Sequence, residues 1–209
     1  MPPLDPALLE KARRSLRRRD PVLAPVIRRV GPCELRRRGD PYRSLLRSVV
    51  YQQLAGPAAG AIAGRLRRHF GGRYPRPEVL LAADEAELRA LGLSRQKAAT
   101  LRAVAAAFAD GTLTNRKLGR MEDAEVVEAV TRIKGIGEWT AHMLLMFSLG
   151  SLDVLPVGDY GVRKGAQQLY GLSALPARRE LEVLGERWRP YRSVASWYLW
   201  RSIEVAPRP

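Results

Sequence analysis

Two features of the sequence, a glycine turn and an acid downstream of it, are suited to chemistry on an anionic molecule. Gly135 and Gly137 flank Ile136, and Asp159 follows in the segment Pro156-Val-Gly-Asp-Tyr160. Two glycines around one apolar residue permit the left-handed backbone angles of a tight hairpin between two helices. The helix after such a hairpin points unpaired N–H groups and the positive end of its dipole at the turn. The turn is therefore suited to bind a phosphate, and Asp159 is an acid available for catalysis.

The elements that must position these residues are helices, because helix-starting signals run through the sequence and alternating strand patterns are nearly absent. Asp5-Pro6, Asp20-Pro21 and Asp40-Pro41 each combine a capping residue with a proline suited to the first helical turn. We expect helices at 6–19, 21–30, 41–54, 57–70, 77–83, 84–91, 94–110, 123–133, 138–150, 160–170, 176–189 and 191–204. The runs 31–38 and 151–155 could be extended but are too short to form a sheet. The predicted fold class is all-α.

The composition favours an acidic partner. A Gly-Ile-Gly turn also links packed helices in many helical proteins, so the turn alone is consistent both with phosphate binding and with an ordinary helix connection. The composition helps to distinguish the two. The formal net charge of +15 and the pI of about 10.9 make nucleic acid the first candidate partner. The basic run of Arg13, Arg14 and residues 17–19 could contact phosphates, but a solvated helix face is the favoured interpretation.

Other classes of site are disfavoured by the residues present. Cys33 is the one cysteine, so the chain cannot form an internal disulfide or a cysteine-built cluster. His69 and His142 lie far apart in the sequence, which argues against a zinc site. We expect no cofactor. The chain shows neither a signal peptide nor an apolar stretch of about 18 residues, so we expect a cytoplasmic protein that does not enter a membrane.

Four segments, together with Asp159, carry a family resemblance. The segment 133–141 resembles the helix-hairpin-helix signature of a superfamily of DNA repair glycosylases, and Asp159 stands where those enzymes keep their catalytic aspartate. The segments 50–56, 92–98 and 189–200 are similar to the alkylation-repair branch, the 3-methyladenine DNA glycosylase II family. The matching segments span about residues 20–205, nearly the whole chain.

This resemblance implies a compact enzyme of two helical lobes with an active-site cleft between them. The chain is too short for the extra N-terminal α/β domain that related enzymes often carry. We expect one lobe at 41–125 and a second that joins 1–40 with 126–209. The second lobe would contain the helix-hairpin-helix at about 126–150 and Asp159. The implied partner is double-stranded DNA containing alkylated bases, and we expect the protein to act as a monomer.

For Asp159 the resemblance implies catalysis. An aspartate before a helix is usually only an N-cap, but the two roles can coexist. Breaking an N-glycosidic bond builds positive charge on the deoxyribose, which an ionised carboxylate stabilises. No second carboxylate has clear motif spacing. A base alkylated at N3 or N7, as in 3-methyladenine or 7-methylguanine, is already cationic and leaves as a neutral molecule, so it needs little protonation. The implied reaction is hydrolysis of the N-glycosidic bond of a flipped base, which leaves an abasic site.

The base pocket is expected to be aromatic. Trp139 and Trp200 align with pocket aromatics of the family, where an electron-rich ring stacks on a cationic base, although tryptophans near helix starts more often pack in a core. Met143 replaces a tyrosine found in alkyl-purine enzymes, which leaves the preference among 3-methyladenine, 7-methylguanine, ethenoadenine and alkylated pyrimidines open. Strand-cutting members of the superfamily have a lysine at the position of Trp139, so we expect a monofunctional enzyme.

Two further DNA contacts are predicted. Gln53 and Leu54 lie at an expected exposed corner before Gly56-Pro57, where Leu54 would fill the gap left by the extruded base and Gln53 would make a polar contact. Leu54 could instead be an ordinary packing residue. In the hairpin, the predicted phosphate contacts are Lys134, Gly135, Ile136, Gly137 and Thr140. The resemblance further implies that a monovalent cation could bind the backbone carbonyls of Thr131, Ile133 and Gly135 and bridge to a phosphate.

Two alternatives remain on the sequence. The first is a non-catalytic helix-hairpin-helix module that only grips DNA, and such a module does not need Asp159. The second is a glycosylase for mismatched or oxidised bases. Trp139 in place of lysine and the lack of a cysteine cluster count against the second alternative.

Overall fold

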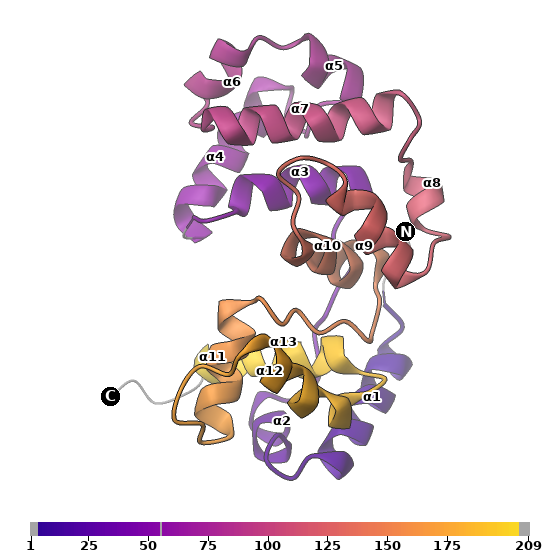
Figure 1. Ribbon diagram of the computed structural model, residues 1–209, viewed down its shortest axis with the longest axis vertical. Helices are drawn as coiled ribbons and strands as arrows, with labels where there is room; N and C mark the ends of the chain where they lie inside the picture. The colour runs from indigo at the N-terminus through magenta and orange to yellow at the C-terminus, as the bar shows by residue number, and fades with distance from the viewer. Residues whose placement is uncertain (1–3, 55, 205–209) are drawn as a thin grey trace. The chain divides into compact units, whose positions relative to one another are not determined.

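The described part of the chain is built from helices. The computed structural model describes residues 4–54 and 56–204 (Figure 1). Within those ranges, helices are joined by turns and loops, and there is no β-strand. The prediction of an all-α fold is therefore confirmed, and the short runs 31–38 and 151–155 are loops.

The chain divides into two compact units. One is Arg38–Leu144, and the other consists of the described residues of Met1–Arg37 and Leu145–Pro209. This division differs from the expected lobes, because residues 126–144 group with the middle of the chain rather than with Asp159. The physical reason is packing: α10 (Glu138–Leu144) contacts α9 (Asp123–Thr131) and also α3 (Pro41–Tyr51).

The helix α3 is central to the Arg38–Leu144 unit. Its N-cap is Asp40, whose Oδ1 accepts a hydrogen bond of 3.0 Å from the backbone N–H of Arg43, and Pro41 occupies the first turn. Its buried side chains Tyr42, Leu45, Leu46, Val49 and Val50 follow the i, i+3, i+4 spacing of one helix face. It contacts α10, α4 (Gly56–His69), α7 (Arg95–Ala109) and α8 (Asn115–Leu118), while α5 (Pro77–Ala82) and α6 (Glu85–Ala90) pack on α7 (Figure 1).

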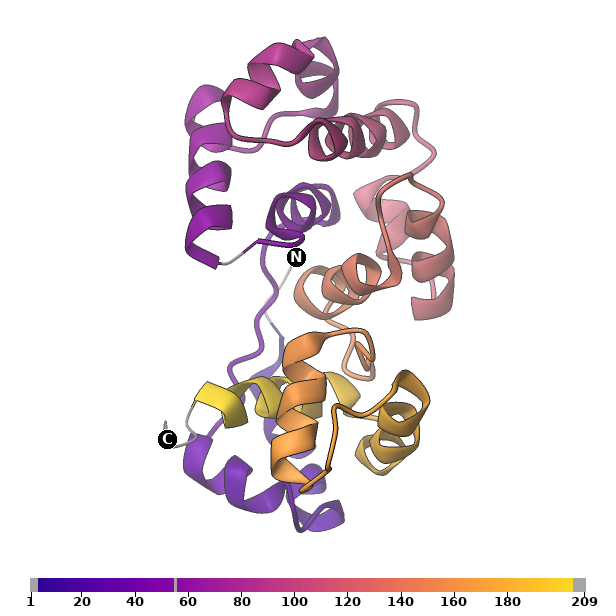
Figure 2. The ribbon, with the colours of Figure 1, turned by 60° about the vertical axis from the view of Figure 1, so that its left-hand side comes forward.

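The other unit is organised around α13 (Arg192–Glu204). This helix packs against α11 (Tyr160–Leu169), α1 (Pro6–Arg19) and α2 (Ala24–Val30), and Figure 2 shows α11 lying across α13. The remaining elements are the π-helix η1 (Leu145–Leu149), α12 (Arg178–Gly185) and the short 3-10 helix η2 (Glu186–Trp188). The core of this unit contains a cluster of buried side chains from all of these helices except η1.

One buried carboxylate belongs to the framework of this unit. Asp20 is fully buried and accepts hydrogen bonds of 3.0 Å from the backbone N–H groups of Val22 and Leu23. Its second oxygen accepts from Trp188 Nε1 at 2.8 Å and from the hydroxyl of Tyr170. A buried carboxylate is stable only with its acceptor capacity used in this way. Asp20 therefore joins the first two helices to η2 and to the end of α11.

The predicted helices occur, with differences at their ends. The predicted helix 138–150 is an α-helix only to Leu144 and continues as the π-helix η1. Ala141, Leu144, Leu145 and Ser148 are buried along it. The helix predicted at 41–54 ends at residue 51, and the segment 176–189 divides into α12 and η2. The short α8 was not predicted, because four residues are too few to show a periodicity.

Candidate active site

The predicted hairpin is the turn between α9 and α10. The Ile136 N–H donates to the Ile133 carbonyl at 3.0 Å, which closes the turn. Gly135 has φ +92°, and a Cβ placed on it would lie 2.1 Å from Thr100 Oγ1 on α7. Glycine is therefore required at 135 for two independent reasons.

Gly137 differs from Gly135. Its φ lies outside the left-handed region, and a Cβ on Gly137 would meet no atom of the described chain within 4 Å. The prediction that the pair of glycines serves left-handed backbone angles therefore holds for Gly135 alone. Gly137 is exposed, and its carbonyl accepts from the N–H groups of Thr140 and Ala141 at 2.9 and 3.2 Å, which starts α10. The open space around Gly137 would let another molecule approach this backbone closely.

The other predicted hairpin residues lie on different sides of the turn. Lys134 is exposed, whereas Ile136 is buried and anchors the turn. The Thr140 side chain is also buried, and its Oγ1 accepts a hydrogen bond of 3.1 Å from Gln52 Nε2. Thr140 is therefore tied to the inside of the motif, because its backbone N–H also donates to the Gly137 carbonyl.

Gln52 connects the predicted wedge corner to this hairpin. Its amide nitrogen also donates to the Gly135 carbonyl at 3.1 Å. Beside it, Lys97 Nζ donates to the Val50 carbonyl at 2.7 Å, and burial lowers the pKa of this lysine. Gln53, the next residue, has φ +54°, which is uncommon for a side chain other than glycine, asparagine or aspartate. The sequence marked Gln52 and Lys97 only as members of matched segments, because no local pattern shows which carbonyl a side chain reaches.

The corner itself is exposed, as predicted. Gln53 is exposed, and Leu54 is 40% exposed, which is high for a leucine next to a packed helix. Ala55, which follows, lies outside the described residues. The exposure of Leu54 disagrees with an ordinary packing residue and leaves its apolar side chain available to another molecule.

The carbonyls predicted to hold a cation can be tested for fit. The Gly135 carbonyl accepts from Gln52, and the Ile133 carbonyl accepts from the N–H of Ile136. A carbonyl oxygen has two lone pairs, so each keeps capacity for one further ligand. The described residues contain no cluster of three or more His, Cys, Asp or Glu side chains that could hold a metal ion.

Asp159 lies at the N-cap of α11, in the unit that contains α13. Its Oδ1 accepts from the Val162 backbone N–H at 2.9 Å and from Trp200 Nε1 at 2.8 Å. Its own N–H donates to the Pro156 carbonyl at 2.8 Å, which forms a turn before the helix. The N-cap role is thus present, and two N–H donors converge on one oxygen, an arrangement suited to an ionised carboxylate.

Trp200 lies with its edge toward the acid. Its ring stacks on Phe147 of η1 with centroids 5.9 Å apart and planes at 22°. The ring also lies close to Gly161, since a Cβ built there would be 2.7 Å from Trp200 Cδ1. The tertiary structure therefore brings Trp200 to Asp159, 41 residues away in sequence. Phe147 was not predicted, since an aromatic residue in an apolar helix has no distinguishing pattern.

Trp139 and Met143 lie on α10, one helical turn apart, in the other unit. Trp139 is partly exposed, and the Met143 side chain is buried with 9% exposure. Residues four apart share a helix face, so both present side chains on the same side of α10.

Comparison with known proteins assigns the chain to a family. A family model described as "HhH-GPD superfamily base excision DNA repair protein" matches residues 46–190. The chain belongs to the HhH-GPD superfamily. The matched range contains the hairpin, Trp139, Asp159 and most of the segments that carried the resemblance.

Named relatives include DNA-3-methyladenine glycosylase 1 of Schizosaccharomyces pombe. It is 37% identical over 169 residues, which cover 80% of this chain and 74% of the relative. The solved structure of S. pombe 3-methyladenine DNA glycosylase (Mag1) in complex with abasic DNA matches with a TM-score of 0.88 and 34% identity, over 95% of this chain and 99% of that one. The structure of a DNA-3-methyladenine glycosidase from Bacillus halodurans matches with a TM-score of 0.81 and 39% identity, over 91% and 88%.

Basic residues after Asp159 have structural partners. Arg163 Nε donates to the Pro176 carbonyl at 2.8 Å, and Lys164 Nζ donates to Gln167 Oε1 at 3.0 Å. The first contact holds α11 to the following loop, and the second lies within α11.

Among the described residues, no helix has the length and apolar character needed to cross a membrane.

Proposed function

We propose that this protein is a monofunctional DNA glycosylase of base excision repair that hydrolyses the N-glycosidic bond of alkylated bases, of the 3-methyladenine and 7-methylguanine type. The observation that carries the proposal is the setting of Asp159. Its carboxylate is held by the start of α11 and by the Trp200 indole, in a chain whose relatives are named DNA-3-methyladenine glycosylases. The protein would act as a monomer, which stays a prediction from the sequence.

Duplex DNA is the partner that the hairpin fits. The Mag1 structure contains abasic DNA, which supports the same partner here. The exposed Lys134 and the open backbone at Gly137 would receive a phosphate, and the carbonyls of Thr131, Ile133 and Gly135 have the donor chemistry of a monovalent cation site. Such a cation would supply positive charge beside the phosphate.

The corner after α3 would act during base extrusion. Leu54 is the exposed apolar side chain that would replace the flipped base in the stack, with Gln53 beside it as a polar contact. Support comes from the tie between Gln52 and the Gly135 carbonyl, because it links this corner to the turn that would hold the backbone.

The proposed chemistry needs one carboxylate. As the bond from C1′ to the base nitrogen breaks, its electron pair stays with the cationic base, which leaves neutral. Asp159 would stabilise the positive charge that develops on the sugar. A water oxygen then bonds to C1′ and releases one proton to the carboxylate or to solvent, which leaves an abasic site. Trp139, Trp200 and Met143 stay proposed as contacts of the extruded base, with Trp139 and Trp200 offering stacking surfaces.

The decisive experiment compares wild type with Asp159→Asn on methylated duplex DNA and identifies released bases by mass. Asparagine can keep the N-cap and the Trp200 hydrogen bond, so folding should be retained. We expect release to fall by at least about 10²-fold, the order seen when one electrostatic contact to a transition state is removed. Equal release by the two proteins would remove Asp159 from the mechanism.

The same assay separates the alternatives. A wild type that binds duplex DNA but releases no base would support a non-catalytic binding module. Release from duplexes carrying an oxidised or mismatched base, and not from methylated DNA, would support the other glycosylase class. The monofunctional assignment predicts that borohydride traps no covalent adduct between the protein and damaged DNA, because Trp139 stands where strand-cutting enzymes have an amine.

A further inference from the structure

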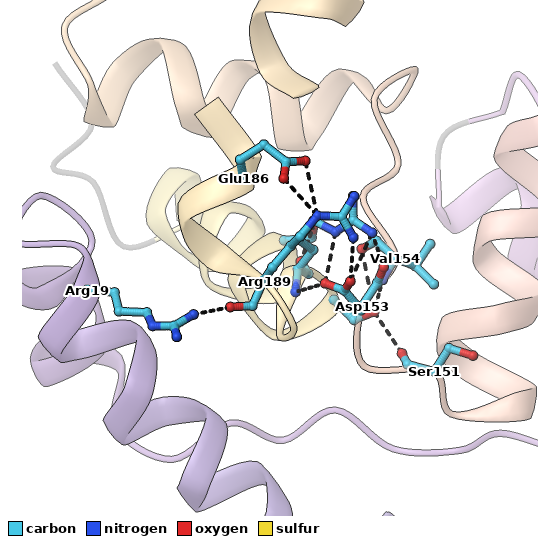
Figure 3. A network of polar contacts seen from close by, with 9 residues as sticks. Arg19, Ser151, Asp153, Val154, Glu186 and Arg189 are labelled. Carbon is cyan, nitrogen blue, oxygen red and sulfur yellow. Dashed lines mark hydrogen bonds and ion pairs between the residues drawn. The ribbon is translucent and has the colours of Figure 1, made fainter. Parts of the chain in front are cut away.

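The loop that leads to Asp159 is fastened to the beginning of α13. Figure 3 shows Asp153 at the centre of a polar network with Arg189, close to Ser151 and Val154. These contacts join two segments separated by about 40 residues in sequence, and all of them lie within one compact unit.

Arg192 makes the most extensive contact with Asp153. Its Nε donates to Oδ1 at 2.8 Å and its Nη2 donates to Oδ2 at 3.0 Å, which is a two-pronged guanidinium–carboxylate pair. Nη2 also donates to the Asp153 carbonyl at 2.8 Å, so the side chain grips the backbone as well. The Arg192 side chain is 18% exposed and that of Asp153 is 28% exposed. Lysine has one point charge and cannot reproduce this fork.

Arg189 contacts the same carboxylate from outside. Its Nη1 donates to Asp153 Oδ2 at 2.9 Å, while its Nε donates to Glu186 and its carbonyl accepts from Arg19. The Arg189 side chain is 48% exposed, so solvent screens this contact more than the Arg192 contact. Arg189 is therefore the weaker arm of the network.

Ser193 fastens the neighbouring loop residues. Its Oγ donates to the Ser151 carbonyl at 2.7 Å and accepts from the Val154 N–H at 3.0 Å, and its own N–H donates to the Leu152 carbonyl at 2.9 Å. Ser193 is fully buried. Two consecutive residues of α13 thus hold the whole stretch from 151 to 154.

The rest of the loop transmits this constraint to the acid. Residues 154–157 are buried, and the turn closes with the Asp159 N–H on the Pro156 carbonyl. At the far end, Trp200 of the same α13 donates to Asp159 Oδ1. Arg192 and Trp200 are eight residues apart, which is about 12 Å along an α-helix. One rigid helix therefore holds the loop at its start and the carboxylate at its end.

We propose that Asp153 and Arg192 are positioning residues for Asp159, an inference that rests on the proposed function. Partly exposed ion pairs contribute little to folding, so a pair with this many contacts is better explained by the geometry it imposes. The Asp153–Arg192 pair fixes the start of the loop that leads to Asp159 relative to α13. Trp200 fixes the position of the Asp159 carboxylate relative to the same helix. Neither residue contacts DNA in this role.

The test uses Asp153→Asn, which keeps the side-chain shape but removes the charge and half of the fork. We expect the single-turnover rate of 7-methylguanine release to fall about 10- to 100-fold, because a displacement of the order of 1 Å at a reacting group costs up to about 10²-fold. Affinity for an abasic-site duplex should stay within about twofold of wild type. Arg192→Lys, a second variant at the other partner, should show the same loss of rate.

The control is Tyr198→Phe. Tyr198 lies on the same helix and its hydroxyl donates to the Gly31 carbonyl at 2.8 Å, away from the loop. This variant should lower the melting temperature without lowering the rate measured well below that temperature. If its rate falls as much as that of Asp153→Asn at equal loss of melting temperature, the pair is merely structural and the proposal is overturned.

A double variant shows whether the pair acts through Asp159. When Asp159→Asn has already removed the carboxylate, adding Asp153→Asn should not lower the residual rate further. A full additional loss would mean that Asp153 acts by another route and would overturn the proposal. If wild type and Asp153→Asn release the base at the same rate, the positioning role is overturned and the proposed function stands. A wild type that releases no base would overturn the proposed function and this role together.

Discussion

Substitution of Gly161 by alanine should disturb the acid through the indole that holds it. Gly161 lies in the first turn of α11, and a Cβ there would be 2.7 Å from Trp200 Cδ1, 3.0 Å from Nε1 and 3.2 Å from Asp159 Oδ1. Ordinary contact between carbon atoms is about 3.5–4.0 Å, so the ring must move by roughly 1 Å. The stack on Phe147 limits the directions in which it can move. The displacement therefore falls on the hydrogen bond between Trp200 and Asp159.

The expected effects on stability and rate differ in size. Alanine in a helix gains about 1 kcal/mol over glycine, while overpacking costs about 1–3 kcal/mol, so the net loss of unfolding free energy should be about 0–2 kcal/mol. A displacement of about 1 Å at a reacting group costs up to about 10²-fold in rate, or about 2.7 kcal/mol of activation free energy. Gly161→Ala should therefore be a folded protein with a large kinetic defect.

The assay is single-turnover release of 7-methylguanine from duplex DNA, together with urea unfolding. Gly158→Ala is the matched control, since Gly158 precedes Asp159 by one residue, is exposed, and a Cβ there meets nothing within 4 Å. The control should keep wild-type rate and stability. A wild-type rate for Gly161→Ala would refute the argument that the indole holds the carboxylate in its working position.

Three further predictions concern other parts of the chain. Gly135→Ala should lose about 2–5 kcal/mol of unfolding free energy in urea titrations, because of the left-handed backbone and the clash with Thr100. Gly137→Ala should unfold like wild type and lose affinity for duplex DNA. Equal DNA affinity for wild type and Gly137→Ala would argue against a phosphate at this turn. Leu54→Ala should weaken binding to a lesion duplex while its melting temperature stays near that of wild type, because the removed side chain is 40% exposed, and a strongly destabilised variant would instead indicate packing. Burial raises the pKa of the Cys33 thiol from 9.0 to about 11. Between these values the folded protein keeps the thiol proton and the unfolded chain loses it. The contribution of Cys33 to the free energy of unfolding is therefore complete below pH 9 and is lost as the pH rises toward 11. Relative to Cys33→Ala, wild type should lose about 1.4 kcal/mol between pH 8 and pH 10, and parallel stability curves for the two proteins would contradict a buried thiol.

The helical framework of this protein follows from local signals. Asp40 with Pro41 starts α3, and Asp159 starts α11, since capping side chains and proline act within one helical turn of the residues they affect. The exposed corner at Gln53 and Leu54 was likewise visible in the sequence, because it falls between two helix signals. The extent of the π-helix η1 was not, because its backbone departs from the ordinary α-helical bond pattern without a marker residue.

What the sequence alone determined is the set of residues at the candidate site: a glycine hairpin, one acid at a helix start, and a tryptophan two residues after the second hairpin glycine. The tertiary structure decided how this set is held together. Trp200 reaches Asp159, Gln52 reaches the hairpin and Asp153 meets Arg192 across 39 to 83 residues of chain. Hydrophobic periodicity indicates which face of a helix is buried, but it does not name the partner that the face meets. Those partners depend on how whole helices pack, and that is a property of the complete fold.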